Sequence, residues 1–428
     1  MAEILILGAG VAGLAAAVTL AEAGHTVTVL EARGRVGGRI HTLRTDEEFV
    51  ELGAEFVHGN PPELLALLDE LHLERYELEG NNLSYDGDGN LNPPKEDEGP
   101  TSLLEGLEEW QGEDVSFARY LQTTSLAPEE QQAAIGYVEG FNAADHRVIG
   151  VRSLIAQQKA EEEIEGDRVF HLRKGYGSLP EALASRLLRA HGSLLLDTHV
   201  NAITWHRGKV CAITNNGRFN ALRAVITFPL GVLQSRSVRM TPEPGEVLRH
   251  ADRMRMGVVC RVTLVFHSRF WAVIPHAHHE QLKQLSFLFS GGDFALPMRV
   301  AWTPYPEESN AVTLWAGGPA ALRFQESTPE EIAHAACDSF AAMLGIEAES
   351  VRNQLRSYYA HDWQSDSLAQ GAYSYVPAGA IDASEAMSEP VEGTLFFAGE
   401  HTDTTGHWGT VHGALRSGLR AARQMGSV

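Results

Sequence analysis

The sequence predicts an α/β protein that begins with a nucleotide-binding strand–turn–helix unit, and its first 33 residues carry the evidence. Residues 3–7, "EILIL", form a short apolar run of the kind that is buried in a parallel sheet. The segment "GAGVAGLAAAVTLAEAG" follows at once, and its alanines and leucines favour a helix. A second apolar run in "HTVTVLEAR" predicts another strand, so the order is strand, helix, strand.

Three glycines lie at the turn between the first strand and the helix. Gly8, Gly10 and Gly13 form the pattern GxGxxG, which combines a tight turn, close approach to a pyrophosphate and close packing of helix on strand. The helix N-terminus would face the phosphate charge. Glu31 ends the second strand, where a carboxylate can accept hydrogen bonds from ribose hydroxyls. The N-terminal part is therefore predicted to be a Rossmann-like dinucleotide-binding domain.

Composition narrows the classes of function. At about 150 residues per domain, 428 residues suggest two or three domains. The formal net charge of −22 argues against nucleic acid as a partner, because phosphate would be repelled. The three cysteines, Cys211, Cys260 and Cys337, form no CxxC pair, so a reducing compartment, the cytoplasm, is expected. No apolar run reaches the length of a membrane span, so no membrane partner is expected.

Further motifs recur along the chain. The segment "RGRVGGRIHT", with a glycine doublet between Arg35 and Arg39, follows the ribose acid and is soon followed by "ELGAEFVHG". Later come "KGYGSLPEALA", "PLGVL", "RVTLVFHSRFW", "QGAYSYVPAG", "FFAGEHT" and "GTVHGALRSGLRAA". In this order the motifs resemble those of the flavin amine oxidase family, which includes monoamine, polyamine and L-amino-acid oxidases. In motif details the sequence is most similar to polyamine oxidases.

The resemblance implies a fold of two interleaved domains. A Rossmann-like FAD-binding domain would comprise residues 1–75, 165–240 and 385–428. An α+β substrate-binding domain built on a mixed sheet would comprise residues 76–164 and 241–384. The turn-rich segment "MTPEPGEV" is consistent with one of these boundaries.

The resemblance also implies which residues hold FAD. The expected residues are Gly8, Gly10, Gly13, Glu31, Arg33, Arg39, Gly53, Ala54, Glu55, Val200, Gly399, Glu400, Thr410 and Val411. The final helix would point its N-terminal amides at the flavin edge that gains negative charge on reduction. FAD is expected to be bound non-covalently, because Ala372 occupies the place of the cysteine to which monoamine oxidases attach their flavin.

Four residues are expected at the reacting end. Tyr373 would form an aromatic wall beside the flavin, whereas Thr410 replaces the second tyrosine of monoamine oxidases, so the aromatic cage is incomplete. His58 matches the histidine that animal-type polyamine oxidases bring into the substrate tunnel. Arg261 stands where the family usually carries a lysine that holds a water against the flavin. If reoxidation of the flavin by dioxygen depends on a positive charge beside the ring, Arg261 supports it. If reoxidation depends on the position of the water, the protein needs another electron acceptor.

The expected reaction is oxidation of an amine by hydride transfer to FAD, hydrolysis of the imine and reoxidation by dioxygen to hydrogen peroxide. An extended amine such as spermine, spermidine or their acetylated forms ranks first, and a monoamine or L-amino acid ranks second. A desaturase or dehydrogenase with another acceptor, and a flavin-bearing scaffold without turnover, remain alternatives. No metal is expected, and "HAHH" at 276–279 is interpreted as a solvated loop. The protein is expected to be a monomer or homodimer.

Overall fold

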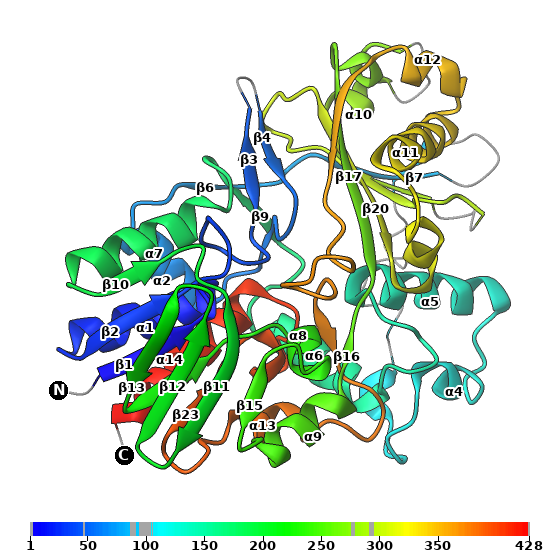
Figure 1. The fold of residues 1–428 in the computed structure, drawn as a ribbon. Helices are drawn as coiled ribbons and strands as arrows, with labels where there is room; N and C mark the ends of the chain where they lie inside the picture. The colour runs from blue at the N-terminus through cyan, green and yellow to red at the C-terminus, as the bar shows by residue number, and fades with distance from the viewer. Residues whose placement is uncertain are drawn as a thin grey trace.

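The computed structural model describes residues 3–45, 48–85, 91–93, 104, 106–274, 279–290 and 295–426. The predicted α/β class is confirmed, because two large sheets and the helices packed on them account for the architecture (Figure 1). No helix within these ranges combines the length and the hydropathy that a membrane crossing requires. Residues 86–90, 94–103 and 105, which belong to the acid-rich stretch 77–114, and residues 276–278 of the "HAHH" run lie outside the described residues.

The first sheet is fully parallel, with the order β10-β2-β1-β14-β23. Its strands are β1 (Glu3–Leu7), β2 (Thr26–Leu30), β10 (Ser193–Leu195), β14 (Arg223–Ile226) and β23 (Leu395–Phe397). The chain leaves β1 for β2 on one side and returns to β14 on the other. In sheets of this kind, ligands bind beyond the carboxyl ends of the strands, where the strand order reverses.

Three helices cover this sheet and share its apolar core. They are α1 (Val11–Glu22), α7 (Ser178–Arg189) and α14 (Val411–Gly426). Helix α1 packs against both α7 and α14, so the first and last helices of the chain lie side by side (Figure 1). Ten of the twelve residues of α1 are buried, which explains its nearly uniform apolar sequence.

A smaller sheet of four strands follows β10, with the order β13-β12-β11-β15. Its strands are β11 (Val200–His206), β12 (Lys209–Thr214), β13 (Gly217–Ala221) and β15 (Arg239–Thr241). The sequence "NNG" forms the turn between β12 and β13, as its hairpin signature predicts.

The second large sheet is mixed, with the order β21-β17-β20-β19-β18-β7-β8. Its strands are β7 (Asn81–Tyr85), β8 (Leu91–Asn92), β17 (Val259–Phe266), β18 (Leu285–Ser290), β19 (Val300–Trp302), β20 (Ala311–Gly317) and β21 (Leu355–Ala360). All eight residues of β17 are buried. Val262, Leu264 and Phe266 belong to the core that α11 (Pro329–Leu344) helps to form. Arg261 points to the opposite face because side chains alternate along a strand.

The remaining strands have two to four residues each, and the remaining helices lie between strands of the several sheets. The strands are β3 (Thr42–Arg44), β4 (Phe49–Glu51), β5 (Val57–His58), β6 (Arg75–Glu77), β9 (Val169–Leu172), β16 (Arg255–Met256) and β22 (Ser374–Tyr375). The helices are α2 (Pro62–Glu70), α4 (Phe117–Leu121), α5 (Pro128–Asn142), α6 (Val151–Glu163), α8 (Leu230–Gln234), α9 (Gly245–Arg253), α10 (His279–Lys283), α12 (Ala348–Arg352) and α13 (Ala383–Ser388).

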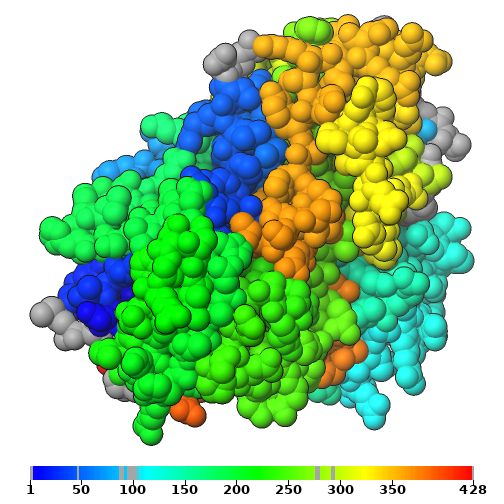
Figure 2. All heavy atoms as spheres, viewed as in Figure 1, coloured from blue at the N-terminus to red at the C-terminus, as the bar shows by residue number. Residues whose placement is uncertain are grey.

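Segments far apart in sequence meet between the sheets. In Figure 2 the orange segment that follows β21 lies against the blue N-terminal segment. Arg33 and Asp366 form an ion pair at 2.8 Å across this contact, and the Trp363 indole donates to the Leu52 carbonyl at 2.8 Å. The first sheet draws on residues 3–30, 193–226 and 395–397, and the second on 81–92 and 259–360. The exact domain boundaries stay a prediction.

Candidate active site

A cavity of about 2250 Å³ lies between the two large sheets. At one end it is lined by Gly8, Leu30 and Thr227, which are next to or at the carboxyl ends of β1, β2 and β14. The cavity-lining residues on one face of the second sheet include Val259, Arg261, Phe287, Phe289, Trp302 and Trp315. The cavity volume exceeds that of an ordinary single-ligand pocket, so it can hold a large cofactor together with a substrate.

The glycine turn has the geometry of a dinucleotide site. Gly8 has φ +111°, and a Cβ atom on Gly13 would lie 2.1 Å from the Gly8 carbonyl oxygen, so both positions exclude larger residues. Gly8 and Gly10 line the cavity, whereas Gly13 packs helix α1 against the turn. The first turn of α1 contains no acidic residue, so its amides are free to face an anion.

Glu31 lies buried beside this turn. Its Oε2 accepts a hydrogen bond from the Ala9 amide at 2.7 Å, and its Oε1 accepts one from the Arg33 amide at 2.9 Å. These bonds fix the carboxylate at the wall of the cavity. A carboxylate offers about four acceptor positions, so two remain for ribose hydroxyls.

An ion pair joins the first and last segments of the chain. Arg39 donates to Glu400 Oε1 at 2.8 Å and to the Ala372 carbonyl at 2.8 Å. Glu400 Oε2 accepts from the Ser374 hydroxyl at 2.6 Å and from the Gly409 amide at 2.9 Å. Burial raises the pKa of Glu400, but Arg39, His401 and Ser374 outweigh it and hold the pKa below its usual value. The carboxylate is therefore charged and rigidly held.

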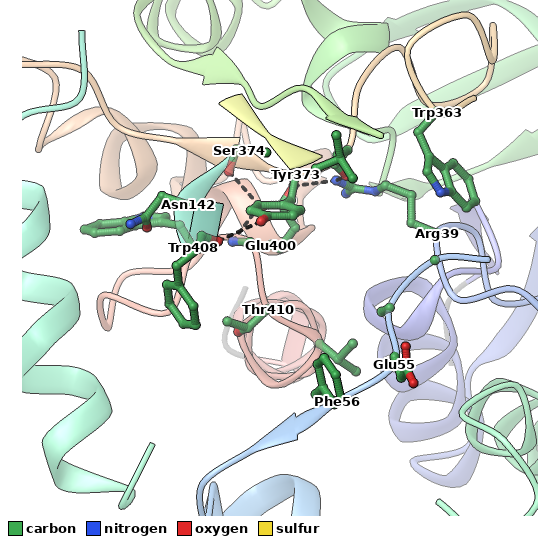
Figure 3. Close-up of a pocket in the computed structure, with 18 of the residues that line it drawn as sticks. Arg39, Glu55, Phe56, Asn142, Trp363, Tyr373, Ser374, Glu400, Trp408 and Thr410 are labelled. Carbon is green, nitrogen blue, oxygen red and sulfur yellow. Dashed lines mark hydrogen bonds and ion pairs between the residues drawn. The ribbon is translucent and has the colours of Figure 1, made fainter. Parts of the chain in front are cut away.

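The glycine- and threonine-rich entrance to the last helix lines the cavity. The Thr410 hydroxyl donates to the His407 carbonyl at 2.8 Å and accepts from the Gly413 amide at 3.0 Å, so Thr410 caps α14. Gly409 has φ +76°, and a Cβ atom there would lie 2.8 Å from the Tyr373 ring. Figure 3 shows Tyr373 and Glu400 on one side of this turn and Phe56 on the other.

Tyr373 is held by one strong contact. Its hydroxyl donates to the Phe141 carbonyl at 2.7 Å, and burial raises its pKa. The tyrosine is therefore neutral, and its ring forms part of the cavity wall. Ala372, next to it, also lines the cavity, and no cysteine does so among the described residues.

Arg261 lines the cavity, but its charge is compensated. It donates to the Gly53 carbonyl at 2.7 Å and forms a short ion pair with Glu55. The guanidinium carbon lies 5.5 Å from the centre of the Trp302 ring. His171 approaches the other oxygen of Glu55 at 3.1 Å. Burial by itself raises the pKa of Glu55. The interactions with Arg261 and His171 together have the larger effect and lower the pKa to about 2. The sequence did not indicate this partner for Arg261.

His58, at the end of β5, is half-buried at the cavity wall. Its ring lies 5.7 Å from the ring of Phe56 and 5.7 Å from that of Phe141, both edge-on. Burial lowers the pKa of His58 to about 4, so the side chain is neutral at neutral pH. It can accept or donate a hydrogen bond without adding charge.

The remaining predicted residues also line the cavity: Gly53, Ala54, Val200, Gly399 and Val411. The structure thus brings every predicted site residue except Gly13 to one cavity. Their roles toward a cofactor or substrate stay predictions.

Sequence reasoning missed Glu161 on α6 and His412 on α14, which also line the cavity. Glu161 lies in "AEEEIE", a segment with the composition of a solvated helix. His412 lies two residues after Thr410, which was predicted. This proximity is the only sequence signal that could have indicated His412.

Comparison with known proteins agrees with this geometry. A family model described as flavin containing amine oxidoreductase matches residues 11–127 and 111–426. The chain therefore belongs to the family of flavin-containing amine oxidoreductases.

Two kinds of relative match with similar identity. "Lysine-specific histone demethylase 1 homolog 2" of Arabidopsis thaliana is 30% identical over 99% of this chain and 58% of its own length. "Polyamine oxidase 3" of Oryza sativa subsp. japonica is 29% identical over 98% of this chain and 88% of its own length. The chain thus spans little more than half the length of the demethylase homologue. The fold matches a solved putrescine oxidase bound to putrescine, with a TM-score of 0.84, 23% identity and coverage of 100% of this chain and 99% of that chain.

The residues present fit FAD. The glycine turn and the start of α1 offer amides to a pyrophosphate, Glu31 has free acceptor positions for a ribose, and the start of α14 faces the interior of the same cavity. When bound, the flavin supplies the hydride acceptor. The buried Arg39–Glu400 pair keeps the two ends of the chain in place around the cavity.

Proposed function

We propose that the protein oxidises an extended amine with more than one cationic group, of the polyamine type, and that dioxygen is the acceptor. The acidic lining of the cavity carries this proposal. Six carboxylates from α5 and from the end of α6 and the loop after it line the cavity: Glu129, Glu130, Glu161, Glu162, Glu165 and Asp167. At the opposite end, the charges of Arg33, Arg39 and Arg261 are compensated by carboxylates. A cationic chain would therefore be attracted toward the α5 and α6 side.

The other walls suit the reaction itself. Aromatic rings of Phe56, Phe141, Tyr373 and Trp302 make the interior largely apolar. A desolvated setting favours the neutral form of the amine, which is the form that can release hydride from its α-carbon. His58, being neutral, can hold that amine by a hydrogen bond without stabilising its protonated form.

A methylated lysine side chain in a protein is the second candidate, because histone demethylase homologues are as similar to this chain as polyamine oxidases are. A peroxide assay with spermine, acetylated polyamines, benzylamine, amino acids and a dimethyl-lysine peptide separates the candidates. We expect peroxide with spermine or its acetylated forms. Peroxide with the peptide alone would support the second candidate. Flavin reduction without peroxide would indicate another electron acceptor.

We expect FAD to be released intact by acid precipitation, because Ala372 has no nucleophilic group for a covalent bond and no described cysteine lines the cavity. All yellow colour should appear in the supernatant. Absorbance spectra of pellet and supernatant measure this, and colour that stays in the pellet would contradict non-covalent binding.

We expect His58→Ala to lower kcat/KM for spermine or its acetylated forms about tenfold, the size of one lost hydrogen bond. The flavin absorbance spectrum and FAD content should stay those of the wild type, because His58 lies on the substrate side of the cavity. Steady-state kinetics with benzylamine serve as the reference. If the kinetic constants of the variant equal those of the wild type with every amine, His58 does not contact the substrate and has a purely structural role.

A further inference from the structure

Three ionisable side chains meet at the α6 side of the cavity. They are Glu161 on α6, His407 in the loop before α14, and His412 in the first turn of α14. One oxygen or nitrogen atom from each lies within 4.8 Å of the others. Glu161 and His412 line the cavity.

Two of these side chains lack partners. Both carboxylate oxygens of Glu161 and Nε2 of His412 are buried without a hydrogen bond in the described part of the chain. His412 is only 2% exposed. Buried polar atoms are almost always hydrogen-bonded, so unpaired ones at a cavity wall call for a ligand. Burial raises the pKa of Glu161 to about 7, although Arg416 opposes this, which shows that its charge is poorly compensated.

His407 differs from the other two because both of its ring nitrogens are engaged. Arg416 Nη1 lies 2.8 Å from Nδ1, and the Ala160 carbonyl oxygen lies 3.1 Å from Nε2. An arginine can only donate, so Nδ1 accepts, and Nε2 carries the proton that is donated to Ala160. His407 therefore has no lone pair left for a metal. Glu161 and His412 alone are too few protein ligands for zinc.

We propose that Glu161 and His412 bind a second, protonated amino group of the substrate, away from the carbon that is oxidised. An ammonium group has three donors and no acceptor, which complements two carboxylate oxygens and one ring nitrogen. Burial and the neighbouring His407, Arg416 and His58 lower the pKa of His412, so it stays neutral and can accept. This inference rests on the proposed function, because it assumes that the cavity holds the substrate.

Binding of a linear diamine and of a monoamine of equal length tests the site. Calorimetric titration of the FAD-loaded protein with diaminooctane and with octylamine requires no turnover if oxygen is excluded and flavin reduction is monitored. In Glu161→Gln we expect diaminooctane to bind about 10- to 100-fold more weakly, the loss of one charge-assisted contact, and octylamine to bind as in the wild type. Glu163→Gln is the matched control, because Glu163 is exposed on the same helix and does not line the cavity.

Each outcome decides the proposal. Equal affinities of wild type and Glu161→Gln for diaminooctane would overturn it, and so would an equal loss for both amines. Tight binding of zinc alone that is abolished in His412→Ala would overturn it in favour of a metal site. A Glu161-dependent preference for diaminooctane in a protein that oxidises no amine would keep this site and refute the proposed function. Oxidation of amines by a protein without that preference would keep the proposed function and refute this site. A bound-flavin absorbance spectrum equal to that of the wild type shows that the variant is folded.

Discussion

Glu55→Leu is expected to destabilise the protein by about 3–5 kcal/mol, because it leaves a buried arginine without its counter-charge. Arg261 is 6% exposed, and Glu55 is its only charged partner among the contacts of the described residues. The change also removes the carboxylate that His171 approaches. Denaturant unfolding of the purified holoprotein, followed by circular dichroism, measures the loss.

The double variant Glu55→Leu with Arg261→Met provides the control. Replacing both members of a buried ion pair by apolar residues of similar size is often neutral, so most of the lost stability should return. A double variant as unstable as the single one would mean that the ion pair is not the cause. The double variant also removes the positive charge beside the cavity, so its rate of reoxidation by dioxygen shows whether Arg261 contributes to that step.

Glu31→Ala is expected to yield protein that purifies largely without FAD. The carboxylate holds the Ala9 and Arg33 amides, so its removal disturbs the glycine turn in addition to losing its own contacts with a ribose. Each lost hydrogen bond to a charged group costs about 1.5–3 kcal/mol, which corresponds to roughly 10- to 100-fold in affinity. The ratio of flavin absorbance to protein absorbance measures occupancy.

Glu31→Gln is the matched control for this prediction. Its amide keeps one acceptor oxygen and nearly the same shape, so occupancy should lie between that of wild type and that of Glu31→Ala. Full occupancy in both variants would mean that the cofactor does not use this carboxylate.

Local sequence signals determine the parts of the fold that were predicted correctly. The strand at residues 3–7, the glycine turn and the helix after it depend on neighbouring residues, and the structure has them as β1 and α1. The "NNG" sequence likewise determines the β12–β13 hairpin locally, because the backbone conformation of these neighbouring residues forms the turn. The order of motifs then gave the family, and with it the segments that meet at the cavity.

Contacts between distant residues could not be predicted in the same way. Arg261 and Glu55 are 206 positions apart, so nothing local shows that one compensates the charge of the other. Glu161 belongs to an acidic run on α6 that resembles a solvated surface, but residues distant in sequence, His407 and His412 among them, pack beside its buried carboxylate. Both features depend on tertiary packing, which a single sequence does not report.

Anaerobic reduction of the bound flavin tests the central claim most directly, because it detects hydride transfer from a substrate without depending on the electron acceptor. The holoprotein is mixed, without oxygen, with spermine, spermidine, their acetylated forms, simple monoamines, amino acids and a dimethyl-lysine peptide. We predict that one or more of the polyamines bleach the yellow absorbance fastest and at the lowest concentration. A flavin that stays oxidised with every amine, in protein that is folded and fully loaded with FAD, would contradict the account.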